Sequence, residues 1–169
     1  MSHRTRLAAL LLALGPLASL PVLAQSVRLI GDFRDWSAYA TSEGAGALCF
    51  ALSKPKDVNP IPDGYTEAYL YLTNRPAENV VFEFNLVAGY VFAPDSQAVV
   101  TVSGQSFDLF TQNDAAWLLD ASQGDSLASA IRAGSTLVVE GTSDKGIRIA
   151  QTFSLAGATA ASRAIESDC

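Results

Sequence analysis

The sequence predicts a mostly antiparallel β domain closed by one disulfide bond. Short apolar runs bounded by turn residues follow one another from Val27 onward, which is the spacing of antiparallel strands and not of alternating strands and helices. A helical period is confined to two segments, one after Asp125 and one at the C-terminus. The sequence contains two cysteines, Cys49 and Cys169, and the second is its last residue.

The first residues predict export. Arg4 and Arg6 precede an unbroken apolar run over residues 7–14, and small residues before Gln25 complete the pattern of a secretory signal peptide. We therefore expect a signal peptide over residues 1–24 and a single mature domain over residues 25–169. An N-terminal membrane anchor is the alternative, but this apolar run is too short to span a bilayer. No later run is apolar enough, so no transmembrane segment is expected after cleavage.

Charge and histidine content narrow the function classes. Cleavage leaves nine Lys and Arg against seventeen Asp and Glu, a net charge of −8 that repels nucleic acid and anionic lipid. It also removes His3, the sole histidine. Ser-His-Asp and Cys-His catalysis and the usual catalytic zinc sites need an imidazole. We therefore expect no enzyme activity, no cofactor and no nucleic-acid partner.

The two cysteines predict one bridge between Cys49 and Cys169. In an oxidising compartment, a pair of cysteines is more often a disulfide than a nucleophile or a metal pair. Two separate free thiols are the alternative. In the chain-entropy model, closing a loop of this length contributes on the order of 5 kcal/mol, which is an upper figure because native strain subtracts from it.

The strands are predicted from alternation and from turn residues. Residues 80–87 alternate strictly, and Ser103-Gly104 supplies the tight turn of the clearest hairpin. A loop over residues 59–64 contains two prolines that cannot donate to a ladder, so it is a stiff connection or a binding loop. The predicted strands cover residues 27–33, 36–40, 47–53, 65–73, 80–87, 98–102, 106–110, 115–119, 137–140 and 147–153.

Two helices are predicted. Asp125 and Ser126 are good N-cap residues, and Gly134 ends the same segment as a C′ glycine. A terminal helix starts from a Ser154 cap and runs to about Glu166, with an apolar stripe of mainly small residues that allows close approach to the sheet.

A series of short stretches along the predicted mature domain forms a recognisable pattern. They are residues 33–36, the cysteine strand with Lys54-Pro55, residues 73–76, Gly89-Tyr90, residues 107–110, Ala116-Trp117 with Asp120, residues 143–146, residues 154–157 and Ala160-Ala161 before the terminal cysteine. Each stretch is short, but by their order and spacing the whole predicted mature domain resembles the invasion-associated locus B (IalB) family of bacterial exported proteins.

The resemblance implies an immunoglobulin-like antiparallel β-sandwich in the periplasm or secreted, with outer-membrane association as a further option. It supplies no catalytic residues. The sequence differs from many members in lacking further cysteines near Trp36, and Ile147 stands where a small polar residue is usual. We expect a virulence-associated, non-enzymatic envelope protein that contacts an envelope or host protein. The alternative is a periplasmic carbohydrate- or metal-binding module. The oligomeric state stays open.

A few aromatic and charged residues are candidate contacts for a partner or ligand. Trp36, Tyr39, Tyr90 and Trp117 could stack on a sugar or a peptide, although burial in the sandwich is the commoner role of such tryptophans. Arg75 precedes a proline at a turn, where it binds a carboxylate ligand or fixes the loop to a neighbouring acid.

Five carboxylates lie near aromatic residues: Asp32, Asp35, Asp108, Asp114 and Asp120. Paired carboxylates can cleave glycosides without histidine, and a calcium site is a second option. Acidic residues at turns of an anionic surface more commonly cap turns and face solvent. We therefore predict neither a catalytic nor a metal site.

Overall fold

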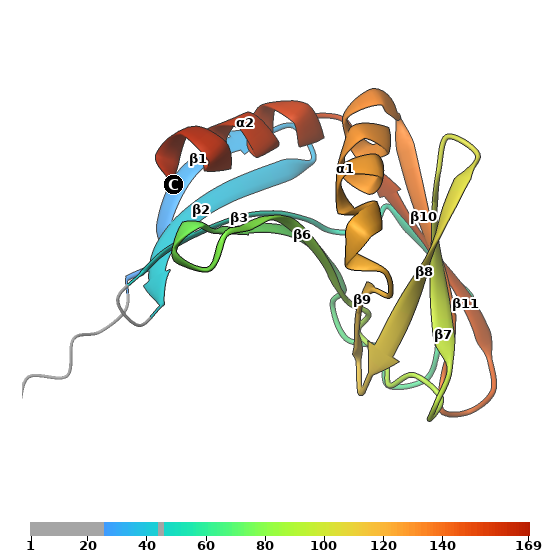
Figure 1. Cartoon of the computed structure of the whole chain (residues 1–169). Helices are drawn as coiled ribbons and strands as arrows, with labels where there is room; N and C mark the ends of the chain where they lie inside the picture. The colour runs from blue at the N-terminus through green and yellow to red at the C-terminus, as the bar shows by residue number, and fades with distance from the viewer. Residues whose placement is uncertain (1–25, 44–45) are drawn as a thin grey trace, which may run out of the picture.

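The computed structural model describes residues 26–43 and 46–169, so the predicted signal peptide lies outside it. Within this part of the chain, the strands form one antiparallel sheet in the order β1-β2-β3-β5-β6-β9-β8-β7-β10-β11-β4 (Figure 1). The strands are β1 (Arg28–Phe33), β2 (Trp36–Glu43), β3 (Gly46–Ser53), β4 (Asp57–Asn59), β5 (Tyr69–Arg75), β6 (Val80–Val87), β7 (Gln97–Val102), β8 (Gln105–Gln112), β9 (Ala115–Leu118), β10 (Thr136–Thr142) and β11 (Arg148–Ser154). The helices are α1 (Gly124–Ala133) and α2 (Ala158–Asp168), with short 3-10 turns η1 (Pro76–Glu78) and η2 (Ala121–Gln123).

The sheet bends into two halves that enclose one core. In Figure 1, β1, β2, β3 and β6 form an arch, and β7, β8, β10 and β11 stand at an angle to it with α1 between the two groups. Alternate residues of β3, β7, β10 and β11 are buried, and Ala38, Leu70, Leu86, Val100 and Phe153 are fully buried. The two layers of the predicted sandwich are therefore two halves of one continuous sheet. The antiparallel all-β fold with a short helix and a C-terminal helix is confirmed.

Two hydrogen bonds of core side chains connect the halves. The indole nitrogen of Trp36 in β2 donates to the carbonyl of Ser154 in β11 at 3.0 Å. Gln151 of β11 donates through Nε2 to the carbonyl of Ala88, just after β6, at 2.8 Å. Because both donors are buried, losing either partner would leave an unsatisfied polar group in the core.

Small residues let α2 pack closely on the first strands. Ala158, Ala161 and Ile165 of α2 are completely buried, and the helix covers β1, β2 and β3 (Figure 1). Here the predicted helix start is wrong. Ser154 is the last residue of β11, and its hydroxyl accepts a hydrogen bond from Ala156 at 3.2 Å. The helix starts at Ala158 after Gly157, whose φ of 98° suits glycine.

Two strand boundaries also differ from the prediction. The strand expected to start at Tyr65 starts at Tyr69, because Tyr65 closes a turn onto Pro62 and Thr66 donates to the carbonyl of Gly89. The chain after Pro55 was not expected to pair, yet β4 adds to β11 at the edge of the sheet. This short strand lies between Pro55 and Pro60, so it lacks the length and alternation that predict strands.

Candidate functional site

A groove of about 630 Å³ opens where β9 diverges from β6. β9 pairs with β6 only at Asn85, Leu86 and Val87. The stretch of β6 from Val80 to Phe84 pairs with β5 on one side and, among the described residues, has no strand partner on the other. The groove is lined by Asn79, Val80, Val81, Phe82, Glu83, Phe84, Phe110, Gln112, Trp117, Leu118, Ala121 and Gly124.

The backbone of β6 is irregular inside this groove. Phe82 has a φ of 52°, which is strained for a bulky residue, and the register between β5 and β6 shifts at this point. The buried side chain of Asn74 accepts a hydrogen bond from the Phe82 N–H at 2.9 Å. The guanidinium of Arg132 in α1 lies 5.1 Å from the Phe82 ring, within cation–π range. The bulge is therefore fixed from both β5 and α1.

An aromatic pair forms one wall of the groove. The rings of Phe110 in β8 and Trp117 in β9 stack with their centroids 5.3 Å apart and their planes 18° apart. Phe110 is 40% exposed and Val81 on the β6 side is 68% exposed. Leu119, just beyond the lining residue Leu118, is 48% exposed. Exposed apolar side chains thus gather around the open stretch of β6.

Charges around the groove are mostly acidic. Arg75 pairs with Glu83 at 2.8 Å and with Glu78 at 3.0 Å. Partial burial acts against the charge of Arg75, but these hydrogen bonds outweigh it and raise the pKa of the guanidinium. Asp120 caps η2, and the hydroxyl and N–H of Ser122 lower the pKa of its carboxyl. Among the described residues, two cations contact lining residues here: Arg75 pairs with Glu83, and Arg132 lies over Phe82.

A second aromatic group lies on the outer face of the sheet, opposite the core. Tyr39 and Phe50 stack at 5.3 Å across β2 and β3, and Phe50 lies 6.0 Å from Tyr71 in β5. Tyr69 continues the row next to Tyr71 at 6.1 Å. All four side chains are half-buried. Lys54 lies over the Tyr69 ring, so this row offers both stacking surfaces and a charge.

Two of the predicted contact residues lie in the core. Trp36 is 1% exposed, and its indole is used by the hydrogen bond to Ser154. Tyr90 is 8% exposed and packs against Phe92 at 4.9 Å. Burial raises the pKa of the Tyr90 phenol far above its ordinary value. In this structure both residues mainly stabilise the fold.

Two more of the predicted contact residues lie at the groove, while Tyr39 belongs to the outer aromatic row. Trp117 lines the groove directly, and Arg75 reaches it through the ion pair with Glu83. Sequence reasoning missed Val81, Phe82 and Phe110, which were treated only as strand residues. The alternation of residues 80–87 predicted the strand but carried no sign that one of its edges would stay open.

The five carboxylates are not brought together. Asp32 accepts a hydrogen bond from Ser37 at 2.6 Å, and Asp35 pairs with Lys56 at 2.5 Å. Hydrogen bonds from Lys56 and Ser154 lower the pKa of Asp35. Within residues 26–43 and 46–169 no group of three or more His, Cys, Asp or Glu side chains is placed to hold a metal ion.

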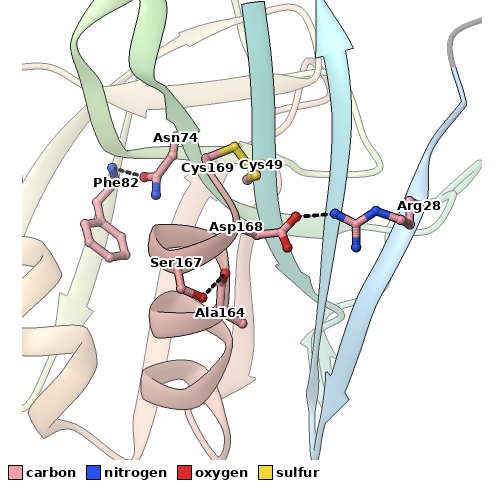
Figure 2. The surroundings of a disulfide bond; sticks show 8 residues. All are labelled: Arg28, Cys49, Asn74, Phe82, Ala164, Ser167, Asp168 and Cys169. Atoms are coloured by element: carbon pink, nitrogen blue, oxygen red, sulfur yellow. Dashed lines mark hydrogen bonds and ion pairs between the residues drawn. A yellow bond between two sulfur atoms is a disulfide. The ribbon is translucent and has the colours of Figure 1, made fainter.

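The predicted disulfide is present. Cys49 of β3 is bonded to Cys169, which follows α2, across a sequence separation of 120 residues. Figure 2 shows this bond beside the ion pair between Arg28 of β1 and Asp168 at the end of α2. The Asn74–Phe82 hydrogen bond lies on the opposite side of the disulfide in the same view. The terminal helix is thus tied to β3 by the disulfide and to β1 by the ion pair.

Comparisons with known proteins support the fold. The sequence matches no known family model and no curated protein. The structure is similar to the crystal structure of invasion associated protein B from Bartonella henselae, with a TM-score of 0.58. The chain shares that fold. The identity is 16%, and the match covers 82% of this chain and 95% of that chain. The fold expected from the IalB resemblance is therefore confirmed at the level of architecture.

None of the helices in the part of the chain that the structure describes is both long enough and apolar enough to cross a bilayer.

Proposed function

We propose that this protein is an exported, non-enzymatic envelope protein of the IalB type that acts by binding another protein. Its shared fold with invasion associated protein B supports the type. The disulfide between Cys49 and Cys169 supports export, because such bonds persist in oxidising compartments. The loss of His3 with the predicted signal peptide supports a role without imidazole-dependent catalysis.

The observation that carries the protein-binding role is the group of exposed apolar side chains around the groove. Val81 and Phe110 line the groove and are 68% and 40% exposed, and Leu119, which follows the lining residue Leu118, is 48% exposed. Contiguous exposed apolar surface next to stacked aromatic rings is typical of a protein-interaction site.

Cross-linking in intact cells, followed by purification of the tagged protein and mass spectrometry, tests this role. We expect one envelope or host protein to co-purify at a stoichiometric ratio. Recovery of the protein alone after efficient cross-linking would contradict the proposal.

A carbohydrate-binding module is the second candidate function. The row of Tyr39, Phe50, Tyr71 and Tyr69 on the outer sheet face favours it, because sugar rings stack on aromatic side chains. Binding of the mature protein to immobilised envelope glycans, lost in Tyr39→Ala, would favour this function. Equal glycan retention of wild type and variant would remove it.

A further inference from the structure

The open stretch of β6 differs from the other free edges of the sheet. β1 and β4 lie at the two ends of the strand order. β1 is interrupted by a register shift between Leu29 and Gly31, and its neighbour along one face is α2. β4 is three residues long and lies between two prolines. Such devices are how natural proteins prevent edges from pairing with other chains.

Two such devices lie along residues 80–84 of β6: the bulge at Phe82 and the contact of its ring with Arg132 of α1. Residues 80–84 nevertheless contain no proline and no lysine, and Glu83 is the one charged residue among them. An unpaired edge of this kind presents backbone N–H and C=O groups that an added strand can bind. At 3.3 Å per residue, the stretch offers a length of roughly 17 Å.

The walls of the groove decide what can reach this edge. Phe110, Trp117, Ala121 and Gly124 line the groove together with residues 79–84. An edge that lies in a groove of this size admits a single extended segment. A second copy of this chain would present the same edge at the bottom of its own groove, so the two β6 edges could not meet.

The charges indicate the composition of that segment. Glu78, Asp120 and Asp125 are exposed and flank the groove near its lining residues, whereas Arg75 is paired with two glutamates and Arg132 lies on Phe82. Apolar walls favour alternate apolar side chains, and acidic flanks favour basic residues at the ends.

We infer that the β6 edge over residues 80–84 is a strand-addition site that binds an extended segment of a partner protein, with alternating apolar side chains and basic residues at its ends. The inference rests on the proposed protein-binding function and specifies its surface. Main-chain hydrogen bonds to β6 hold the segment, and the Phe110–Trp117 pair receives its apolar side chains.

A capped synthetic peptide of alternating valine and threonine with a lysine at each end is the probe. Amide hydrogen exchange of the mature, oxidised protein, followed by NMR, locates its binding. We expect exchange to slow by about tenfold, when the site is filled, at those amides of residues 80–84 that are not already bonded within the protein, because new hydrogen bonds protect them. The Phe82 amide should not change, because it already donates to Asn74. No protection at the other amides of this stretch, or protection at β1 or β4 instead, overturns the inference.

Two control peptides separate strand pairing from other binding. The same peptide with all internal amides N-methylated keeps the side chains but loses the backbone donors, so its affinity should fall at least about tenfold. Replacing both lysines with glutamates should weaken binding and reverse its salt dependence, because salt then screens a repulsion instead of an attraction. An unchanged affinity of the N-methylated peptide contradicts strand addition.

Two variants with opposite chemistry test the groove. Phe110→Ala removes the aromatic wall, and Gly124→Phe fills the groove from a position where an added Cβ meets no atom within 4 Å. Both should weaken peptide binding by at least about tenfold. Tyr39→Ala removes an equivalent stacked pair on the outer face and should bind as wild type does. Equal binding by all four proteins contradicts the assignment.

Co-purification of the partner from cells distinguishes failure of the β6 strand-addition site from failure of the proposed protein-binding function. If a stoichiometric partner co-purifies equally with wild type, Phe110→Ala and Gly124→Phe, the protein-binding function stands and the β6 site is wrong. If wild type recovers no partner, the proposed function is wrong. Loss of the partner in both groove variants, with Tyr39→Ala unaffected, supports both.

Discussion

The side chain of Asn74 in β5 accepts a hydrogen bond from the backbone N–H of Phe82 in β6, at 2.9 Å (Figure 2). The bulge removes the Phe82 N–H from the regular ladder between β5 and β6, and Asn74 accepts its hydrogen bond instead. The bulge places Phe82 under Arg132 at the open stretch of β6. A polar side chain in one strand therefore shapes the edge that the neighbouring strand presents.

Asn74→Ala should destabilise the protein by about 1–3 kcal/mol, because the Phe82 N–H loses its partner in a part-buried place. Urea unfolding followed by circular dichroism measures the change. Thr101→Ala removes an exposed hydrogen bond to Ser106 and should cost less than about 0.5 kcal/mol. Equal losses in the two variants would show that the Asn74 bond has no special role.

Gly157→Ala should be severely destabilising, by about 3 kcal/mol or more. An added Cβ would lie 1.7 Å from the carbonyl oxygen of Phe33, and the φ of 98° is unfavourable for alanine. Gly64 is the control, since its φ is 75° but no atom lies within 4 Å of an added Cβ. Gly64→Ala should cost about 1–2 kcal/mol from backbone strain alone. Calorimetric melting of both variants compares them, and similar melting temperatures would contradict the close contact.

Removing both cysteines, as Cys49→Ala with Cys169→Ala, should lower the free energy of unfolding by up to about 5 kcal/mol. The bond closes a loop with a sequence separation of 120 residues and ties α2 to β3. Urea unfolding of the double variant and of the wild type with reductant should give the same loss. A wild-type midpoint that reductant leaves unchanged would contradict a stabilising bridge.

The protein should lose stability as the pH rises above about 10. Burial raises the pKa of the Tyr90 phenol, and the neighbouring Tyr65 raises it further. Burial also raises the pKa of Tyr65, so both phenols stay neutral in the folded state beyond their ordinary range. The unfolded chain releases these protons first, so a raised folded pKa contributes stability below the unfolded pKa and loses it above. Tyrosinate absorbance and circular dichroism should therefore change together.

Tyr90→Phe is the matched variant for this pH dependence. It keeps the ring against Phe92 and should be close to wild type at neutral pH while resisting alkaline unfolding better. If all tyrosines ionise near their ordinary pKa while the fold persists, the burial of Tyr90 does not limit alkaline stability.

Much of the fold followed from residue patterns, because alternation and turn residues act locally. The strand over residues 80–87 and the Ser103-Gly104 hairpin were predicted correctly. The single possible pairing of the two cysteines predicted the long-range tie between β3 and the end of α2. By contrast, β4 was missed because its pairing with β11 is decided by the fold and not by its own three residues.

The candidate site was harder to predict for the same reason. Trp117 was recognised as an aromatic candidate, but its stacking on Phe110 and the open edge of β6 depend on where β9 leaves the sheet. Trp36 and Tyr90 were aromatic candidates on the same grounds as Trp117, but they lie in the core. Sequence shows which residues could bind, and only the strand order shows which of them lie beside an unpaired edge.

Site-specific photo-cross-linking in the producing cells tests the central claim most directly. A photoreactive residue at position 81, where valine is 68% exposed in the groove, is compared with one at position 61, where isoleucine is 70% exposed in a loop. The account predicts a discrete adduct with one partner protein from position 81 and none from position 61. No adduct from position 81, or the same adduct from both positions, would contradict it.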